Sequence, residues 1–252
     1  MIKMKMLALL RIIRHLLFKV NLCKTIYINY KMFPFRYAMK LPIYVYGRII
    51  FRDLSGEILI KGNIHSGMIK IGKNDYYVAT SIPLSIWTVR GNIIFNGPIN
   101  FLQGSYILVS DNASLEFGCN STFCGSNLKV MCFDSIKIGN NVEITWDVQI
   151  MDTSFHYISI LDHEPCKLTA PITIGDFVWI GNKTTIMKGA MIPNRTIVAS
   201  NSLVNKDFHD IGQYCLLAGQ PAKVKANGFM RIYDTERQKR MDMKFGYVRT
   251  HL

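Results

Sequence analysis

Residues 151–160, MDTSFHYISI, bring a histidine, an aspartate and four hydroxyl side chains into one short stretch. A histidine imidazole can take a proton from an attacking hydroxyl and return one to a leaving group, so His156 is a candidate general base. Asp152 can accept from the other ring nitrogen and fix the tautomer, or it can act as a turn or cap residue. His163, a few residues further on, is the second candidate base.

This stretch interrupts a strict period of six. Aliphatic residues recur every six positions on both sides of it, at Ile138, Ile144 and Ile150 and again at Ile174, Ile180, Ile186, Ile192, Val198 and Val204. Continued from Ile150, the period would place His156 and Asp162 in a buried column, where unpartnered polar groups are costly. We therefore expect residues 151–170 to leave the repeat as a protruding loop, with PITIG restarting the repeat.

A period of six needs its own explanation, because a strand repeats every two residues and an α-helix every 3.6. A short strand followed by a tight turn gives six, with one aliphatic side chain pointing inward. Three such units make a triangular coil of about eighteen residues, and stacked coils form a parallel β-helix. The small fifth residue of most hexads fits beside the turn, and glycine at the second position relieves strain there. The predicted stacks are Ile192 on Ile174, Val198 on Ile180 and Val204 on Ile186.

Changes of texture divide the chain into three parts. Residues 1–48 are predicted to be an N-terminal helix and linker, 49–221 the parallel β-helix, and 222–252 a charged, helical tail. The N-terminal helix carries an apolar stripe from Met6 to Val20 flanked by basic residues. Such a stripe can pack on its own domain, on a neighbouring subunit or on an anionic bilayer. Packing is its commoner use, and no apolar run approaches the ~20 residues of a membrane span.

The composition favours anionic partners. Lys and Arg number 30 against 17 Asp and Glu, a formal net charge of +13. No nucleic-acid-binding motif is present, so phosphorylated ligands and membrane surfaces rank above nucleic acid. The six cysteines include no CxxC pair and no zinc-site spacing. We expect free, largely buried thiols in a reducing cytoplasm.

The segments IGNNVEITWDVQIMDTSFH, PITIGDFVWIGNKTTIMKGAMI and LLAGQPAKVK resemble the hexapeptide-repeat acyltransferases. The nearest likeness is to bacterial O-acetyltransferases that modify capsular or lipopolysaccharide sugars. It extends over about residues 136–225 and weakens over 25–135. The resemblance implies left-handed coiling, a homotrimer, acetyl-coenzyme A as the acyl donor, and active sites in clefts between subunits.

The same resemblance implies roles for individual residues. His156 matches the catalytic base, and Asp152 is its candidate partner. Coenzyme A contacts are expected from Trp179, Gly181, Ala199, Ser200, Lys206, Pro221, Ala222 and Lys223. Asn127 and Trp146 are candidates to face the sugar acceptor, and no metal is expected.

Three functions remain open from the sequence. The first is acetyl transfer to a sugar hydroxyl of a cell-surface polysaccharide precursor, in the cytoplasm or at the inner face of the membrane. An amine acceptor or a longer acyl donor is a variant of it. The second is a zinc hydratase of the γ-carbonic-anhydrase kind, for which His156 and His163 lack a third histidine on the coils. The third is a non-catalytic binding solenoid, which an isolated histidine loop does not favour.

Overall fold

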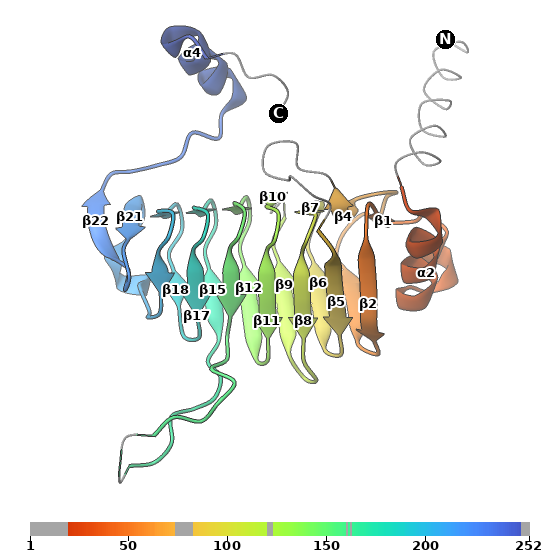
Figure 1. Cartoon of the computed structure of the whole chain (residues 1–252). Coiled ribbons are helices and arrows are strands. Elements are labelled where there is room, and N and C mark those ends of the chain that lie inside the picture. The colour runs from red at the N-terminus through yellow and green to blue at the C-terminus, as the bar shows by residue number, and fades with distance from the viewer. Residues whose placement is uncertain (1–19, 74–82, 120–122, 160, 162, 248–252) are drawn as a thin grey trace.

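In the computed structural model, the chain forms three parallel sheets wound together as a stack of three-sided coils (Figure 1). The structure describes residues 20–73, 83–119, 123–159, 161 and 163–247. The chain visits the three sheets in turn, so each strand from β1 to β17 pairs in parallel with the third strand after it. One side of a coil therefore corresponds to one hexad, which is the arrangement that the period of six predicts.

The strands are distributed over the sheets as follows. Sheet 1 contains β1 (Ile43–Val45), β4 (Ile69–Lys73), β7 (Ile99–Leu102), β10 (Phe123–Cys124), β13 (Glu143–Ile144), β16 (Trp179–Ile180), β19 (Ile197–Val198), β21 (Cys215–Ala218) and β22 (Lys223–Asn227). Sheet 2 contains β2 (Ile49–Leu54), β5 (Ser85–Val89), β8 (Tyr106–Val109), β11 (Lys129–Cys132), β14 (Gln149–Met151), β17 (Thr185–Met187) and β20 (Leu203–Val204). Sheet 3 contains β3 (Glu57–Ile60), β6 (Asn92–Phe95), β9 (Ser114–Phe117), β12 (Ser135–Ile138), β15 (Ile172–Ile174) and β18 (Met191–Ile192).

The predicted rungs are confirmed by the strand register. The paired residues include Ile174 with Ile192, Ile180 with Val198, and Ile186 with Val204. The fifth residue of each hexad is also buried, as the small side chains there predict; these residues are Val178, Thr184, Ala190, Thr196, Ser202 and Phe208. Each inward side chain thus contacts its counterparts one coil above and below.

Aromatic side chains fill the earlier coils. The ring of Phe101 lies 5.0 Å from that of Trp87 and 5.3 Å from that of Phe117, both edge-on. Phe95 stacks on Phe117 with ring centroids 5.6 Å apart. These rings are large, and their coils depart from six residues a side, so the period is less regular here than after residue 136.

The expected linker is wrong in its first half, because residues 22–32 form a helix. This helix, α2 (Leu22–Met32), is capped by Asn21, whose side chain accepts from the Lys24 N–H at 3.1 Å, and it ends before Pro34. A short helix, α3 (Phe35–Ala38), follows, and the first coil already begins at β1. The sequence hid α2 because its buried face includes Thr25 and Asn29, which are polar. Their side chains bond to the backbone of β1 instead of packing as an apolar stripe.

The C-terminal tail begins as a strand and ends as a helix. β22 pairs antiparallel with β21, so the coiled body extends past the expected boundary at residue 221. The chain then returns over sheet 1, where Arg231 forms an ion pair with Glu143 and the Tyr233 hydroxyl donates to the Phe177 carbonyl at 3.0 Å. The predicted helix is α4 (Thr235–Phe245), and η1 (His209–Ile211) is a single 3-10 turn.

Two other expectations concern the N-terminus and the cysteines. The apolar stripe lies outside the described residues except for Val20, which is buried. Among the helices that the structure describes, none is long and apolar enough to cross a bilayer. All six cysteines are free, but only Cys124, Cys132 and Cys215 are buried; the other three are exposed.

Candidate functional site

An arm formed by residues 152–170 leaves the stack between β14 and β15, where the interrupted period predicts a loop. Figure 1 shows it extending well away from the coils. At its root, Thr153 and Thr169 form an antiparallel bridge. The Ala170 N–H donates to the Asp152 carbonyl at 3.0 Å. The two ends of the arm are therefore held side by side at the carboxyl end of β14 in sheet 2.

Asp152 is fully buried at this root, and its carboxylate faces the preceding coil. One oxygen accepts from the Phe133 N–H at 2.7 Å and the other from the Asp134 N–H at 2.9 Å. Burial raises the pKa of Asp152 above its ordinary value, although these two bonds and the Cys132 thiol act in the opposite direction. Of its two candidate roles, the geometry supports the turn and cap role, because the carboxylate is bonded to backbone rather than to His156.

Lys188 is a residue of this region that the sequence reasoning missed. Its ammonium donates to the Ser154 hydroxyl at 3.1 Å, to the Leu168 carbonyl at 3.3 Å and to the Lys167 carbonyl. It thus links both strands of the arm's root to the next coil. A lysine in a hexad carries no signal by itself. The signal is positional: Met151 pairs with Met187, so Lys188 lies one coil beyond the point where the arm leaves.

His156 lies on the arm just beyond this root. Its N–H donates to the Ser154 carbonyl at 2.7 Å, and the Ser154 hydroxyl donates back to the His156 carbonyl at 3.1 Å. Neighbouring Phe155 packs edge-on against Phe133, with ring centroids 5.2 Å apart. The His156 side chain is exposed, and within the described residues its ring has no hydrogen-bond partner. The backbone of the histidine is fixed while its imidazole stays available.

A second feature is the corner between sheets 1 and 2, where the chain repeatedly turns with positive φ. The left-handed residues there are Asn127, Asp147, Lys183 and Asn201, with φ between 57° and 58°. Backbone bonds join successive turns, from Asp147 N–H to Ser126, Lys183 N–H to Trp146, and Asn201 N–H to Asn182. The Asn127 side chain donates to Asp147 at 3.0 Å and lines a shallow pocket of about 270 Å³.

This corner gathers many of the predicted binding residues. Asn127 and Trp146 lie in its turns, and Gly181 packs against Ser200 in the later coils. The Ala199 N–H donates to Leu217, and the Ser200 hydroxyl donates to the Asn182 side chain at 2.5 Å. Pro221 follows a cis peptide bond, and buried Ala222 donates to the Leu203 carbonyl at 2.7 Å.

Three predicted residues lie apart from the turns themselves. Half-buried Trp179 begins β16, between Glu143 and Ile197 on neighbouring strands of sheet 1. Lys223 is exposed and pairs with Ala218, so it borders the same corner. Lys206 is also exposed but follows β20, so it lies at the carboxyl ends of the strands of sheet 2, away from the corner.

Within one chain, the structure does not bring the candidate base to this corner. Asn127 precedes β11 and Trp146 precedes β14, whereas the arm follows β14. Because the strands of sheet 2 are parallel, the corner lies at their amino ends and the arm at their carboxyl ends. Among the residues that the structure describes, no three His, Cys, Asp or Glu side chains group as a metal site. The expectation of no metal stays a prediction.

Comparison with known proteins identifies the family. Over 173 residues, 69% of this chain and 77% of the relative, the sequence is 30% identical to the galactoside O-acetyltransferase of Escherichia coli strain K12. The chain belongs to the hexapeptide-repeat acetyltransferases. The stacked coils with their six-residue repeat are therefore the scaffold of this family, and the chain is an acetyltransferase.

Two further comparisons extend over more of this acetyltransferase. It is 27% identical over 202 residues, 80% of its length and 86% of the relative, to an uncharacterized 24.8 kDa protein in the cps region of Klebsiella pneumoniae. The crystal structure of the polySia-specific acetyltransferase NeuO matches its fold with a TM-score of 0.57 at 16% identity, covering 83% of this chain and 91% of NeuO. No profile of a known protein family matches the chain.

Proposed function

We propose that this acetyltransferase moves an acetyl group from acetyl-coenzyme A to a sugar hydroxyl of a cell-surface polysaccharide precursor, with His156 as the general base. The observation that carries the proposal is the arm itself. It holds the backbone of an exposed histidine at a braced root on the scaffold of a known acetyltransferase family. The relatives named above as acetyltransferases of a galactoside and of polySia support a sugar acceptor.

The imidazole supplies the proton transfer that this reaction needs. A sugar hydroxyl is a poor nucleophile until a base removes its proton during attack on the acyl carbon. The ring nitrogen of His156 takes that proton and then gives it to the departing sulfur, so the histidine is regenerated. Backbone N–H groups of the coils are suitable donors for the carbonyl oxygen as it gains negative charge.

The corner between sheets 1 and 2 fits the acyl donor in its residue types. Acetyl-coenzyme A supplies an acetyl group activated as a thioester on a long, phosphorylated carrier. Buried Gly181 lets the turn that holds Ser200 pack closely against its own. Half-buried Ala199 and exposed Ser200 are small residues that can border the carrier, and exposed Lys223 can pair with its phosphates. Asn127 and Trp146, in the earlier turns of the corner, are our candidates to contact the acceptor.

We also propose that the acetyltransferase is a homotrimer of left-handed β-helices in which the arm of one subunit reaches the corner of the next. Two observations support assembly. The arm lies at the carboxyl ends of the strands of sheet 2 and the corner at their amino ends, so one chain does not complete the site. The arm also exposes large apolar side chains, Tyr157 at 74% and Leu161 at 86%, which a neighbouring subunit would cover.

Lys188 and Asp152 are positioning residues in this proposal. Both act on the root of the arm, Lys188 through Ser154 and two carbonyls, and Asp152 through two backbone N–H groups. Neither has a hydrogen bond to His156 in the described residues.

Six free cysteines further support a reducing compartment such as the cytoplasm.

The first experiment measures thiol release from acetyl-coenzyme A against a panel of sugars, amino sugars and polysaccharide precursors. We expect turnover with hydroxyl acceptors, and acetyl esters that are sensitive to mild base. Longer acyl-coenzyme A donors and amine acceptors are run in parallel. Faster transfer to an amine, or no transfer to any hydroxyl, would contradict the proposed reaction.

A subunit-mixing experiment tests the shared site. His156→Ala removes the base, and Ser200→Trp puts a bulky ring into the corner of an otherwise unchanged chain. If the arm of one subunit serves the corner of another, trimers assembled from both inactive variants regain sites with an intact arm and an intact corner. Mixed trimers without activity would place the whole site within a single chain.

A further inference from the structure

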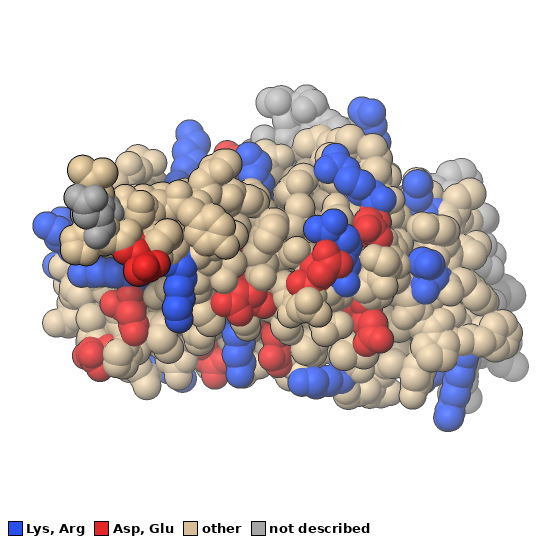
Figure 2. Space-filling view, turned by 90° about the horizontal axis from the view of Figure 1, so that it is seen from below, with Lys and Arg blue, Asp and Glu red and all other residues tan. Residues whose placement is uncertain are grey.

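The positive charge of this protein is concentrated at one end of the chain. Residues 1–52 contain 11 Lys and Arg and no Asp or Glu, whereas the other 200 residues contain 19 and 17. On the face that Figure 2 shows, acidic side chains gather over the coils, and the end that carries α2 shows Lys and Arg without Asp or Glu. The net charge of +13 therefore comes mainly from the first 52 residues of the sequence.

Helix α2 at this end is oriented with aromatic residues toward solvent. Its exposed stripe is Cys23, Ile26, Tyr27, Tyr30 and Lys31, spaced at i, i+3, i+4, i+7 and i+8. Its buried side includes Thr25 and Asn29, which are hydrogen-bonded to β1. Ile26, Tyr27 and Tyr30 are each about half exposed. The helix thus turns an aromatic stripe away from its own core.

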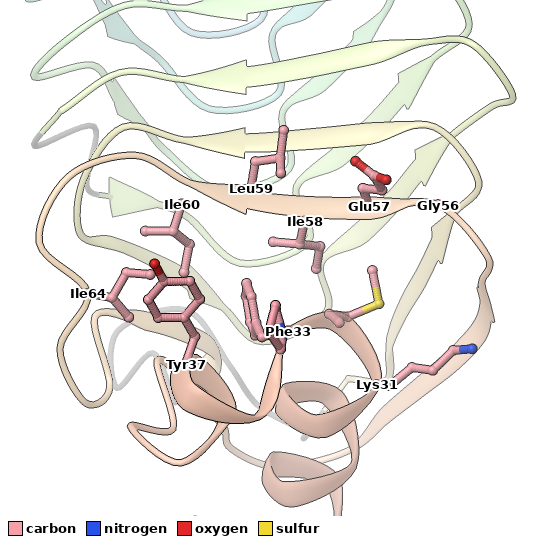
Figure 3. A pocket seen from close by; sticks show the side chains of 11 residues that line it. Lys31, Phe33, Tyr37, Gly56, Glu57, Ile58, Leu59, Ile60 and Ile64 are labelled. Atoms are coloured by element: carbon pink, nitrogen blue, oxygen red, sulfur yellow. The ribbon is translucent and has the colours of Figure 1, made fainter.

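Helix α3 continues the same surface. Phe35 is 69% exposed and Met39 is 59% exposed, and the Phe35 ring lies 6.1 Å from that of Tyr30. Between α3 and β3 lies a groove of about 480 Å³, which Figure 3 shows bordered by Phe33, Tyr37 and Ile60. Lys31, Arg36 and Lys40 are exposed among these apolar groups. We call the exposed residues of α2, of α3 and of the two positions that follow α3 the aromatic–basic face.

Charge selects the partner of the aromatic–basic face. A second copy docked symmetrically would bring Lys31, Arg36 and Lys40 of both copies together, which like-charge repulsion disfavours. A soluble polyanion would satisfy the charges but leave Ile26, Phe35 and Met39 in water. An anionic bilayer satisfies both, since tyrosine and phenylalanine favour the interface and cations are attracted to acidic headgroups.

We propose that the aromatic–basic face binds anionic lipid bilayers and holds the enzyme at a membrane surface. The face lies at the N-terminal end of the stack, whereas the arm follows β14, four coils further along. Binding there leaves the arm and the corner between sheets 1 and 2 open. This proposal concerns a separate surface and does not rest on the proposed acetyl transfer.

The test is flotation of the full chain with vesicles of phosphatidylcholine alone or with about one third phosphatidylglycerol. We expect binding to the anionic vesicles, weakened by salt, and little binding to the neutral ones. Lys31→Gln, Arg36→Gln and Lys40→Gln together should weaken binding roughly 100-fold, since each basic residue near the surface contributes about fivefold. The matched control neutralises three exposed charges elsewhere, with Lys137→Gln, Arg240→Gln and Lys244→Gln, and should bind almost as the wild type does.

A second variant tests the apolar part of the same surface. Tyr27→Ser, Tyr30→Ser and Phe35→Ser remove exposed rings, so the fold should persist by circular dichroism while vesicle binding falls. Wild-type binding by both triple variants, or no vesicle binding by the wild type, would overturn the proposal. Loss of self-association rather than of lipid binding in the serine variant would assign the face to a second copy and would also overturn it.

Discussion

The coils and the arm follow opposite rules. In the coils, Ile180 and Val198 are neighbours on a ladder in which each rung resembles the next, and each side chain is identified by its position in a hexad. In the arm, Asp152, Ser154 and His156 each have a contact that no other residue repeats. Under the proposed mechanism the two regions divide the work, with stability from the repeated apolar rungs and reactivity from the one irregular loop.

This division predicts separable losses. A substitution in a rung should lower the free energy of unfolding and leave turnover per folded molecule unchanged. A substitution on the exposed part of the arm should lower turnover and leave the free energy of unfolding unchanged. The root of the arm joins the two regions, so changes there should have smaller effects on both properties.

The largest effect is expected from His156→Ala. Removal of a general base lowers turnover by about 10² to 10⁴-fold, and the exposed side chain contributes little to folding. Thiol release gives the rate, and thermal denaturation should show an unchanged midpoint. His163→Ala, on the same arm and also exposed, is the matched control and should retain activity. Loss of turnover in the control alone would transfer the role to His163.

Phe101→Ala should give the largest loss of stability. This side chain is 1% exposed and contacts Trp87 and Phe117, so truncation leaves a cavity that costs about 3 to 5 kcal/mol. Urea denaturation at a fixed protein concentration measures the change, because the proposed assembly would make the midpoint depend on concentration. Turnover per folded molecule should match the wild type; a selective loss of turnover would contradict the division.

Asp152→Asn should cost about 1 to 3 kcal/mol of stability. The carboxylate accepts hydrogen bonds from two backbone N–H groups, and in the variant the amide NH2 would face one of these donors and leave it unpaired. Turnover should fall only slightly, whereas a residue that orients the imidazole would cost far more. A loss of turnover near 10⁴-fold with normal stability would restore Asp152 as the partner of His156.

The pH dependence of this stability difference has a definite sign. Burial raises the native pKa of Asp152 above 3.8, so the native state retains the proton to a higher pH than the unfolded chain does. The contribution of Asp152 to stability is therefore full below about pH 4 and declines as the pH rises through the native pKa. Urea denaturation of the wild type and Asp152→Asn should show their difference narrowing over that range. A difference that widens with pH would contradict the raised pKa.

Lys188→Met should lower turnover by about tenfold through a less well-placed arm, far less than His156→Ala does. The arm should also be cleaved faster by protease, because the ammonium no longer links Ser154 and Leu168. Lys188→Arg keeps the charge and the donors, so it should restore most of both properties. Normal protease resistance in the methionine variant would remove Lys188 from the positioning of the arm.

The vesicle experiment separates a third region from both. Substitutions on the aromatic–basic face should leave the effects of His156→Ala and Phe101→Ala unchanged, since α2 and α3 lie at the far end of the coils from the corner residues Gly181 and Ser200.

Periodicity in the amino-acid sequence was enough to predict the coil, its rungs and the place of the arm. Position in a hexad determines which side chain points inward, so the pairing of Ile174 with Ile192 and of Ile186 with Val204 follows from spacing alone. A histidine that falls in a buried column must leave it, and this argument placed His156 outside the stack. Both inferences rest on local periodicity, which a linear sequence displays directly.

Contacts between distant parts of the chain set the remaining features. Polar Thr25 and Asn29 interrupt any apolar period in α2, because their side chains bond to the backbone of a strand 14 to 20 residues away. Lys188 became part of the arm's root only when the register set Met187 beside Met151. The carboxylate of Asp152 turned to Phe133 and Asp134 because their N–H groups lie one coil back. These contacts join residues distant in the chain through hydrogen bonds, which leave no periodic pattern in the sequence.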